Sequence, residues 1–211
     1  MTRGARLARF AALLLAVPAA TAIAQDTTML EARVDRPTYI AVRAIVDSAR
    51  SAKLPTKPLM DKAFEGAAKG SDGPKIIVAV HQLSVRMGSA KRTLGPSTTN
   101  DEIRAAVSAI EAGISVRDLA RLRAASGKRP VTMPLAVLTD LVARQVPIPT
   151  ATDLVLQLAR SGVRDNDLAI FQRNVRADID RGADPSAAAT TRARGLVARG
   201  ASPPAKPVPM Q

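Results

Sequence analysis

Four short breaks of related composition divide the second half of the chain, and each lies between two stretches with helical periodicity. They are Gly113-Ile114-Ser115, Gln145-Val146-Pro147, Gly162-Val163-Arg164-Asp165 and Gly182-Ala183-Asp184-Pro185. Glycine can adopt the left-handed conformation that ends a helix, the following apolar residue can pack back on it, and Ser or Asp can cap the next helix. Because such short connections make consecutive helices neighbours, the pattern predicts an all-α fold of short antiparallel helices.

Aliphatic residues between the breaks recur at three- and four-residue steps, which places them on one helix face. We expect about nine helices. Thr99 and Glu102 have the spacing of a capping box at the start of the fourth. The expected helices begin near residues 39, 58, 74 and 99, and then span residues 116–125, 133–144, 149–161, 167–181 and 185–199.

The breaks are spaced at an interval typical of helix-pair repeats. Ile114 and Val146 are 32 residues apart, and Val146 and Ala183 are 37 residues apart. The first half does not keep this period, and no fixed repeat signature accompanies it. We therefore predict an irregular, helical-repeat-like bundle.

The N-terminus has the features of a secretory signal peptide. Three arginines precede an apolar stretch over residues 10–17, and Ala22-Ile23-Ala24 fits a cleavage site. The stretch is shorter than the ~20 residues of a membrane-spanning helix. We expect cleavage after Ala24 and a periplasmic or secreted bacterial protein without a transmembrane segment. Cleavage removes three of 31 basic residues and none of 18 acidic ones, which lowers the net charge from +13 to +10.

The mature chain is expected to contain one domain. Residues 25–36 are polar and weakly patterned, which favours a flexible lead-in, and the helical domain covers residues 37–200. Residues 201–211 contain four prolines and no apolar period, which favours a disordered tail.

Composition excludes several kinds of site. The chain has no cysteine, so it forms no disulfide and carries no thiol chemistry. It has no Trp, one Tyr and three Phe, so the core is aliphatic. The stacking faces on which sugar and single-stranded nucleic-acid sites depend are scarce.

Catalytic motifs are missing at the level of sequence. His81 is the one histidine, and no serine lies in a G-x-S-x-G or S-x-x-K motif. Gly127-Lys128 lacks the other residues of a phosphate loop, and residues 178–182 lack those of a calcium loop. We therefore expect no metal and no cofactor. A carboxylate-type hydrolase, with acids such as Asp140 and Asp153 meeting in a cleft, remains an alternative.

The candidate binding residues form a basic cluster. Five cations lie within thirteen positions, against the single acid Asp118: Arg117, Arg121, Arg123, Lys128 and Arg129. Such a cluster can bind a phosphate-bearing lipid, an acidic glycan or an acidic protein surface. The alternative is a solvated helix face.

A second candidate is a seam of small residues near the second helix. Ala63, Gly66, Ala67 and Gly70 share one face and allow another backbone to approach closely. Packing of the chain's own neighbouring helix is one interpretation, and a groove for a foreign partner is the other.

These observations favour an exported, non-catalytic binding or scaffold protein of the bacterial cell envelope. The alternatives are a binder of anionic lipid or glycan through the basic cluster, and a carboxylate-type hydrolase. We expect a protein partner or an anionic envelope component and no nucleic acid. The sequence leaves the oligomeric state open.

Overall fold

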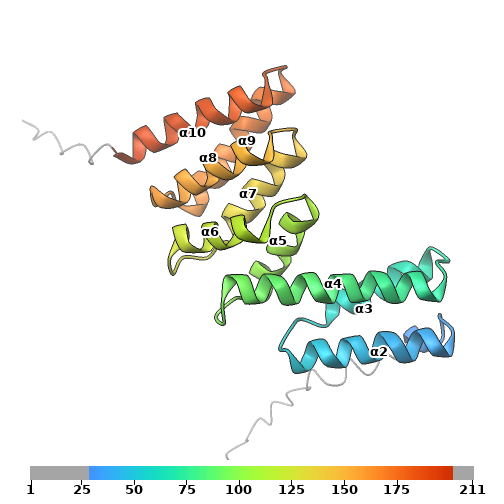
Figure 1. Cartoon of the computed structure of the whole chain (residues 1–211). Helices are drawn as coiled ribbons and strands as arrows, with labels where there is room; N and C mark the ends of the chain where they lie inside the picture. Colours follow the sequence, from blue (N-terminus) through green and yellow to red (C-terminus); the bar gives the residue numbers. More distant parts are fainter. Residues whose placement is uncertain (1–28, 202–211) are drawn as a thin grey trace, which may run out of the picture.

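The computed structural model describes residues 29–201, which are all-helical and contain no strand (Figure 1). This confirms the predicted fold class. After a short helical turn at residues 29–31, nine helices follow in this part of the chain. They are α2 (Arg36–Ser51), α3 (Lys57–Ala68), α4 (Gly73–Leu94), α5 (Asn100–Glu111), α6 (Val116–Ser126), α7 (Thr132–Ala143), α8 (Ile148–Arg160), α9 (Asp165–Asp180) and α10 (Pro185–Ala201).

The helices form two layers, because most of them contact the helix two positions further along the chain. Helices α2, α4, α6, α8 and α10 contact one another in that order, and α5, α7 and α9 do the same. Contacts between consecutive helices, such as α4 with α5 and α9 with α10, join the layers. The result is one continuous stack, with α2 at one end and α10 at the other (Figure 1).

Six of the corners between the described helices share one hydrogen-bonding pattern. At the end of α5, Gly113 has a φ of +91°, and the N–H of buried Ile114 donates to the carbonyl of Ala109 at 3.0 Å. A left-handed residue followed by a bond of this type defines a Schellman motif. The same arrangement occurs at Lys53, Gly70, Gln145, Gly162 and Gly182.

Two helix starts differ from the sequence-based prediction. α2 begins at Arg36 and not at Tyr39, because the Asp35 carboxylate accepts bonds from the N–H and hydroxyl of Thr38 at 2.9 and 2.7 Å. α9 begins at Asp165, so the prediction that Asp165 caps α9 is wrong. The N-cap position belongs to Arg164, whose side chain pairs with Asp167 at 3.1 Å.

The core is aliphatic, as the composition requires, and it is densest around α7 and α8. Leucines from these two helices are fully buried, and Phe171 of α9 is the buried aromatic residue of the described chain. Leu30, within the expected lead-in, is also buried in this core. The fully buried leucines of α7 and α8 are Leu135, Leu138, Leu141, Leu156 and Leu158.

The expected signal peptide over residues 1–24 lies outside the described residues, and so does the expected tail beyond Ala201. Ala201 itself is the last residue of α10. Among the described helices, none combines the length and the apolar character that crossing a membrane demands.

Candidate functional site

No hydrogen bond or ion pair joins the residues considered for catalysis to one another within residues 29–201. His81 is exposed on α4. Asp140 pairs with Arg144 of its own helix at 3.0 Å, and Asp153 faces solvent and lies 3.4 Å from Arg121. Neither acid lines any of the cavities described below. Within residues 29–201, no three His, Cys, Asp or Glu side chains are grouped so that they could hold a metal ion.

The basic cluster is divided by the fold, and Arg123 lies in its interior part. Arg123 donates to the carboxylate of Glu102 at 3.2 Å and to the carbonyls of Gly127 and Arg129. It therefore joins α5 and α6 to the loop that follows α6.

Arg129 has a similar internal role. Its guanidinium donates to the carbonyls of Ala159 and Val163, at the end of α8 and in the corner after it. Helix ends leave carbonyls without an intrahelical partner, and a guanidinium can satisfy them. Arg129 thus fastens the α6–α7 loop to α8.

The other three cations of the cluster point to solvent. Arg121 pairs with Asp118 at 2.9 Å and with Asp153 at 3.4 Å. Arg117 and Lys128 are exposed, and within the described chain neither has a hydrogen-bond or ion-pair partner. Two of the five predicted residues are therefore available to an anion without breaking an internal contact.

Glu102 is the acidic centre of this region, and it is 4% exposed. Its carboxylate accepts bonds from the N–H of Thr99 at 2.9 Å and the N–H of Val131 at 3.0 Å, besides that from Arg123. Burial by itself raises the pKa of Glu102, but these donors and the charge of Arg123 outweigh it, and the pKa lies below its ordinary value.

The small-residue seam lies between α3 and α4. Ala63 is buried, Ala67 packs against the core, and a Cβ on Gly66 would lie 2.8 Å from Cγ1 of Ile76 in α4. Gly70 lies beyond the end of α3, is exposed and has a φ of +66°, because it forms the corner before α4. The chain's own helix α4 therefore occupies the close approach at Gly66.

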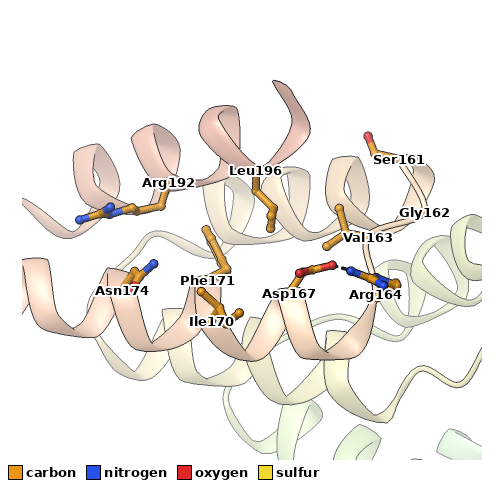
Figure 2. A pocket seen from close by; sticks show the side chains of 10 residues that line it. All are labelled: Ser161, Gly162, Val163, Arg164, Asp167, Ile170, Phe171, Asn174, Arg192 and Leu196. Carbon is orange, nitrogen blue, oxygen red and sulfur yellow. Dashed lines mark hydrogen bonds and ion pairs between the residues drawn. The ribbon is translucent and has the colours of Figure 1, made fainter. Parts of the chain in front are cut away.

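Two cavities lie on either side of the corner formed by residues 161–164. The first, of about 440 Å³, lies between α9 and α10 (Figure 2). Leu196 of α10 and Phe171 of α9 extend into the space between these helices, beside Val163. Its arginines already have acidic partners: Arg164 pairs with Asp167, and Arg192 pairs with Asp178 at 2.6 Å.

The second cavity, which we call the corner cavity, has a volume of about 370 Å³ and lies between the α6–α7 loop, the end of α8 and the start of α9. Ser126 lines it, and the buried Ser126 hydroxyl has no hydrogen-bond partner. The first turn of α9 is also in its wall, at Asp165 and Asn166, and no side chain caps that turn. Buried polar groups without partners are uncommon in folded proteins.

The corner cavity is a candidate binding site, and its serine lacks the partner that nucleophilic catalysis requires. Ser126 is not hydrogen-bonded to a base, which a serine nucleophile requires. The N–H groups of the α9 first turn can instead hydrogen-bond a polar segment, above an apolar wall that includes Pro134, Ala159 and Leu168. The Ser126 hydroxyl itself is buried within that wall. No motif in the sequence indicates this cavity, because its residues come from two separate stretches of the chain, 126–134 and 159–168.

No protein-family model matches the chain, and searches of the curated proteins and of the solved structures found no similar protein.

Proposed function

We propose that this chain is an exported, non-catalytic scaffold protein of the bacterial cell envelope that binds a protein partner. The observation that carries the proposal is the two-layered stack, in which helices two positions apart contact one another in rows. Proteins built as helical stacks act through such extended surfaces, and each unit contacts its neighbours only. Export rests on the predicted signal peptide.

The corner cavity is the proposed partner site. The uncapped start of α9 supports this choice, because its first-turn N–H groups can hydrogen-bond an exposed polar segment of the partner. Ser126, with its buried and unpartnered hydroxyl, forms part of the cavity wall. Because Arg123 and Arg129 hold internal groups, the basic cluster is the less favoured surface, and Arg117 and Lys128 are its available part.

Crosslinking the purified protein to an envelope extract, followed by quantitative mass spectrometry, tests this site. Ser126→Leu places an apolar side chain at the cavity wall and should remove most of the specific crosslinked partner. Thr152→Val is the matched control, because Thr152 carries the other unpartnered buried hydroxyl and does not line the cavity. If both variants recover the same partners as the parent protein, the corner cavity is not the site.

A double variant tests the alternative function, binding of an anionic lipid or glycan through the basic cluster. Arg117→Glu with Lys128→Glu reverses the two cations that have no internal partner. Binding through phosphates should be lost in this double variant and should weaken steeply with salt. Binding at the corner cavity should survive both changes.

A further inference from the structure

The two ends of the stack carry grooves of nearly equal volume. At one end, a groove of about 430 Å³ runs along the outer face of α2, past Tyr39, Ile40 and Ala44. At the other end, the cavity of about 440 Å³ lies between α9 and α10. Each end therefore has a concave surface that no described helix covers.

Each groove also presents an exposed isoleucine. Ile40 of α2 is 56% exposed, whereas Val42 and Val46 of the same helix are buried on its opposite face. Ile170 of α9 is 42% exposed and lines the α9–α10 groove together with Phe171 and Leu196 (Figure 2). The end units of helical-repeat proteins need a polar outer face for solubility. Ile40 and Ile170 are the apolar side chains that a contact between the two ends would cover.

The contact pattern of the stack indicates that a helix would fit the α9–α10 groove. Each later helix contacts the helix two positions before it, as α10 contacts α8 and α9 contacts α7. A further helix added to the stack would therefore lie against α9 and α10. The cavity beside Phe171, Ile170 and Leu196 lies between those two helices.

The electrostatics of the two ends permit two copies to approach, despite the net charge of +13. At the α2 groove, Arg36 and Arg43 are balanced by Glu31 and Asp47. At the other end, Arg164 and Arg192 are paired with Asp167 and Asp178. Neither groove carries the excess positive charge that would make copies of this chain repel one another there.

We infer that this chain associates head to tail with a second copy of itself, and that the outer face of α2 in one copy occupies the α9–α10 groove of the next. The contact extends the internal stacking across two chains, with α2 in the place of the next helix. Two different surfaces meet, so the association is heterologous and builds rings or open chains. This interface borders the proposed partner site, because Gly162, Val163 and Arg164 line both cavities.

Sedimentation velocity of the purified protein, from low micromolar to submillimolar concentration, tests the inference. The weight-average mass should rise with concentration, past that of a dimer. Ile40→Glu and Ile170→Glu should each weaken the association at least about tenfold, because each buries a charge without a partner. Val85→Glu is the matched control: Val85 is 54% exposed on α4, within the stack, and its variant should associate like the parent protein.

Mixing the two isoleucine variants gives the sharpest outcome. Each keeps the surface that the other has lost, so an equimolar mixture should form a dimer with one copy of each and stop there. Circular dichroism should report parental helix content, and Ile40→Ser and Ile170→Ser replace any variant that unfolds. A parent protein that stays monomeric overturns the inference. So does a dimer that Ile40→Glu leaves intact, because such a dimer joins two identical ends.

Discussion

Glu102 and Arg123 form an ion pair at 3.2 Å although 21 positions separate them in the chain. The same carboxylate caps the start of α5 and accepts the N–H of Val131. One buried side chain thus connects α5, α6 and the loop that leads to α7.

Glu102→Gln should destabilise the protein by about 2–3 kcal/mol, because it weakens several charge-assisted bonds at once and leaves Arg123 without its acidic partner. Chemical denaturation measures this change. The control is Glu111→Gln, which removes an exposed ion pair with Arg86 at 3.4 Å and should change the stability by less than about 1 kcal/mol. Equal effects of the two substitutions would contradict a central role for Glu102.

The lowered pKa of Glu102 predicts how the stability of the protein depends on pH. The pKa of Glu102 lies below its ordinary value of 4.5 in the folded protein, so between the two values the unfolded chain binds more protons. The contribution of Glu102 is therefore complete above about pH 4.5 and is lost as the pH falls through the folded-state pKa. Denaturation between pH 3 and pH 7 should show a steeper loss of stability for the parent protein than for Glu102→Gln.

Arg129→Ala should destabilise the protein by about 1 kcal/mol, because it leaves the carbonyls of Ala159 and Val163 without this donor. Its neighbour Lys128 has no partner in the described chain, and Lys128→Ala should change the stability by less than about 0.5 kcal/mol. Thermal unfolding of the two variants compares them directly. If Arg129→Ala leaves the stability unchanged, Arg129 has no structural role and is available to bind a ligand.

Gly66→Ala should destabilise the protein by about 1 kcal/mol, although alanine favours a helix interior. The new Cβ would lie 2.8 Å from Cγ1 of Ile76, close to the root of that side chain, and overpacking of this kind exceeds the gain in propensity. In an Ile76→Ala background the sign should reverse, since the space is then free. Gly195→Ala is the control, because a Cβ there meets nothing within 4 Å, and it should stabilise.

The sequence predicted those parts of the structure that depend on nearby residues. The corner at Gly113 and the capping box of Thr99 and Glu102 form within a few positions, so their residue types reveal them. The corner at Lys53 lies outside the predicted series, although Lys53-Leu54-Pro55 has the same pattern as the predicted corner Gln145-Val146-Pro147. In both corners a residue with a Cβ adopts the left-handed conformation.

The candidate site could not be predicted in the same way. Arg129 reaches carbonyls 30 and 34 positions away, and its sequence neighbours show only a run of cations. Ser126 ends a helix with an ordinary composition, and its lack of a partner depends on where α8 and α9 lie. Such features follow from the stacking of helices, which the sequence indicates only as a class of fold.

Gln145→Gly should stabilise the protein by about 0.5–1 kcal/mol. Gln145 has a φ of +69°, a conformation that strains residues with a Cβ, and glycine adopts it freely. The N–H of buried Val146 donates to the carbonyl of Leu141 in either case, so the corner keeps its geometry. The reciprocal change, Gly113→Gln, puts a side chain on a residue with a φ of +91° and should destabilise by a similar or larger amount. Urea denaturation measures both variants. If Gln145→Gly lowers the midpoint, the greater freedom of glycine in the unfolded chain outweighs the relief of strain, and the prediction is wrong.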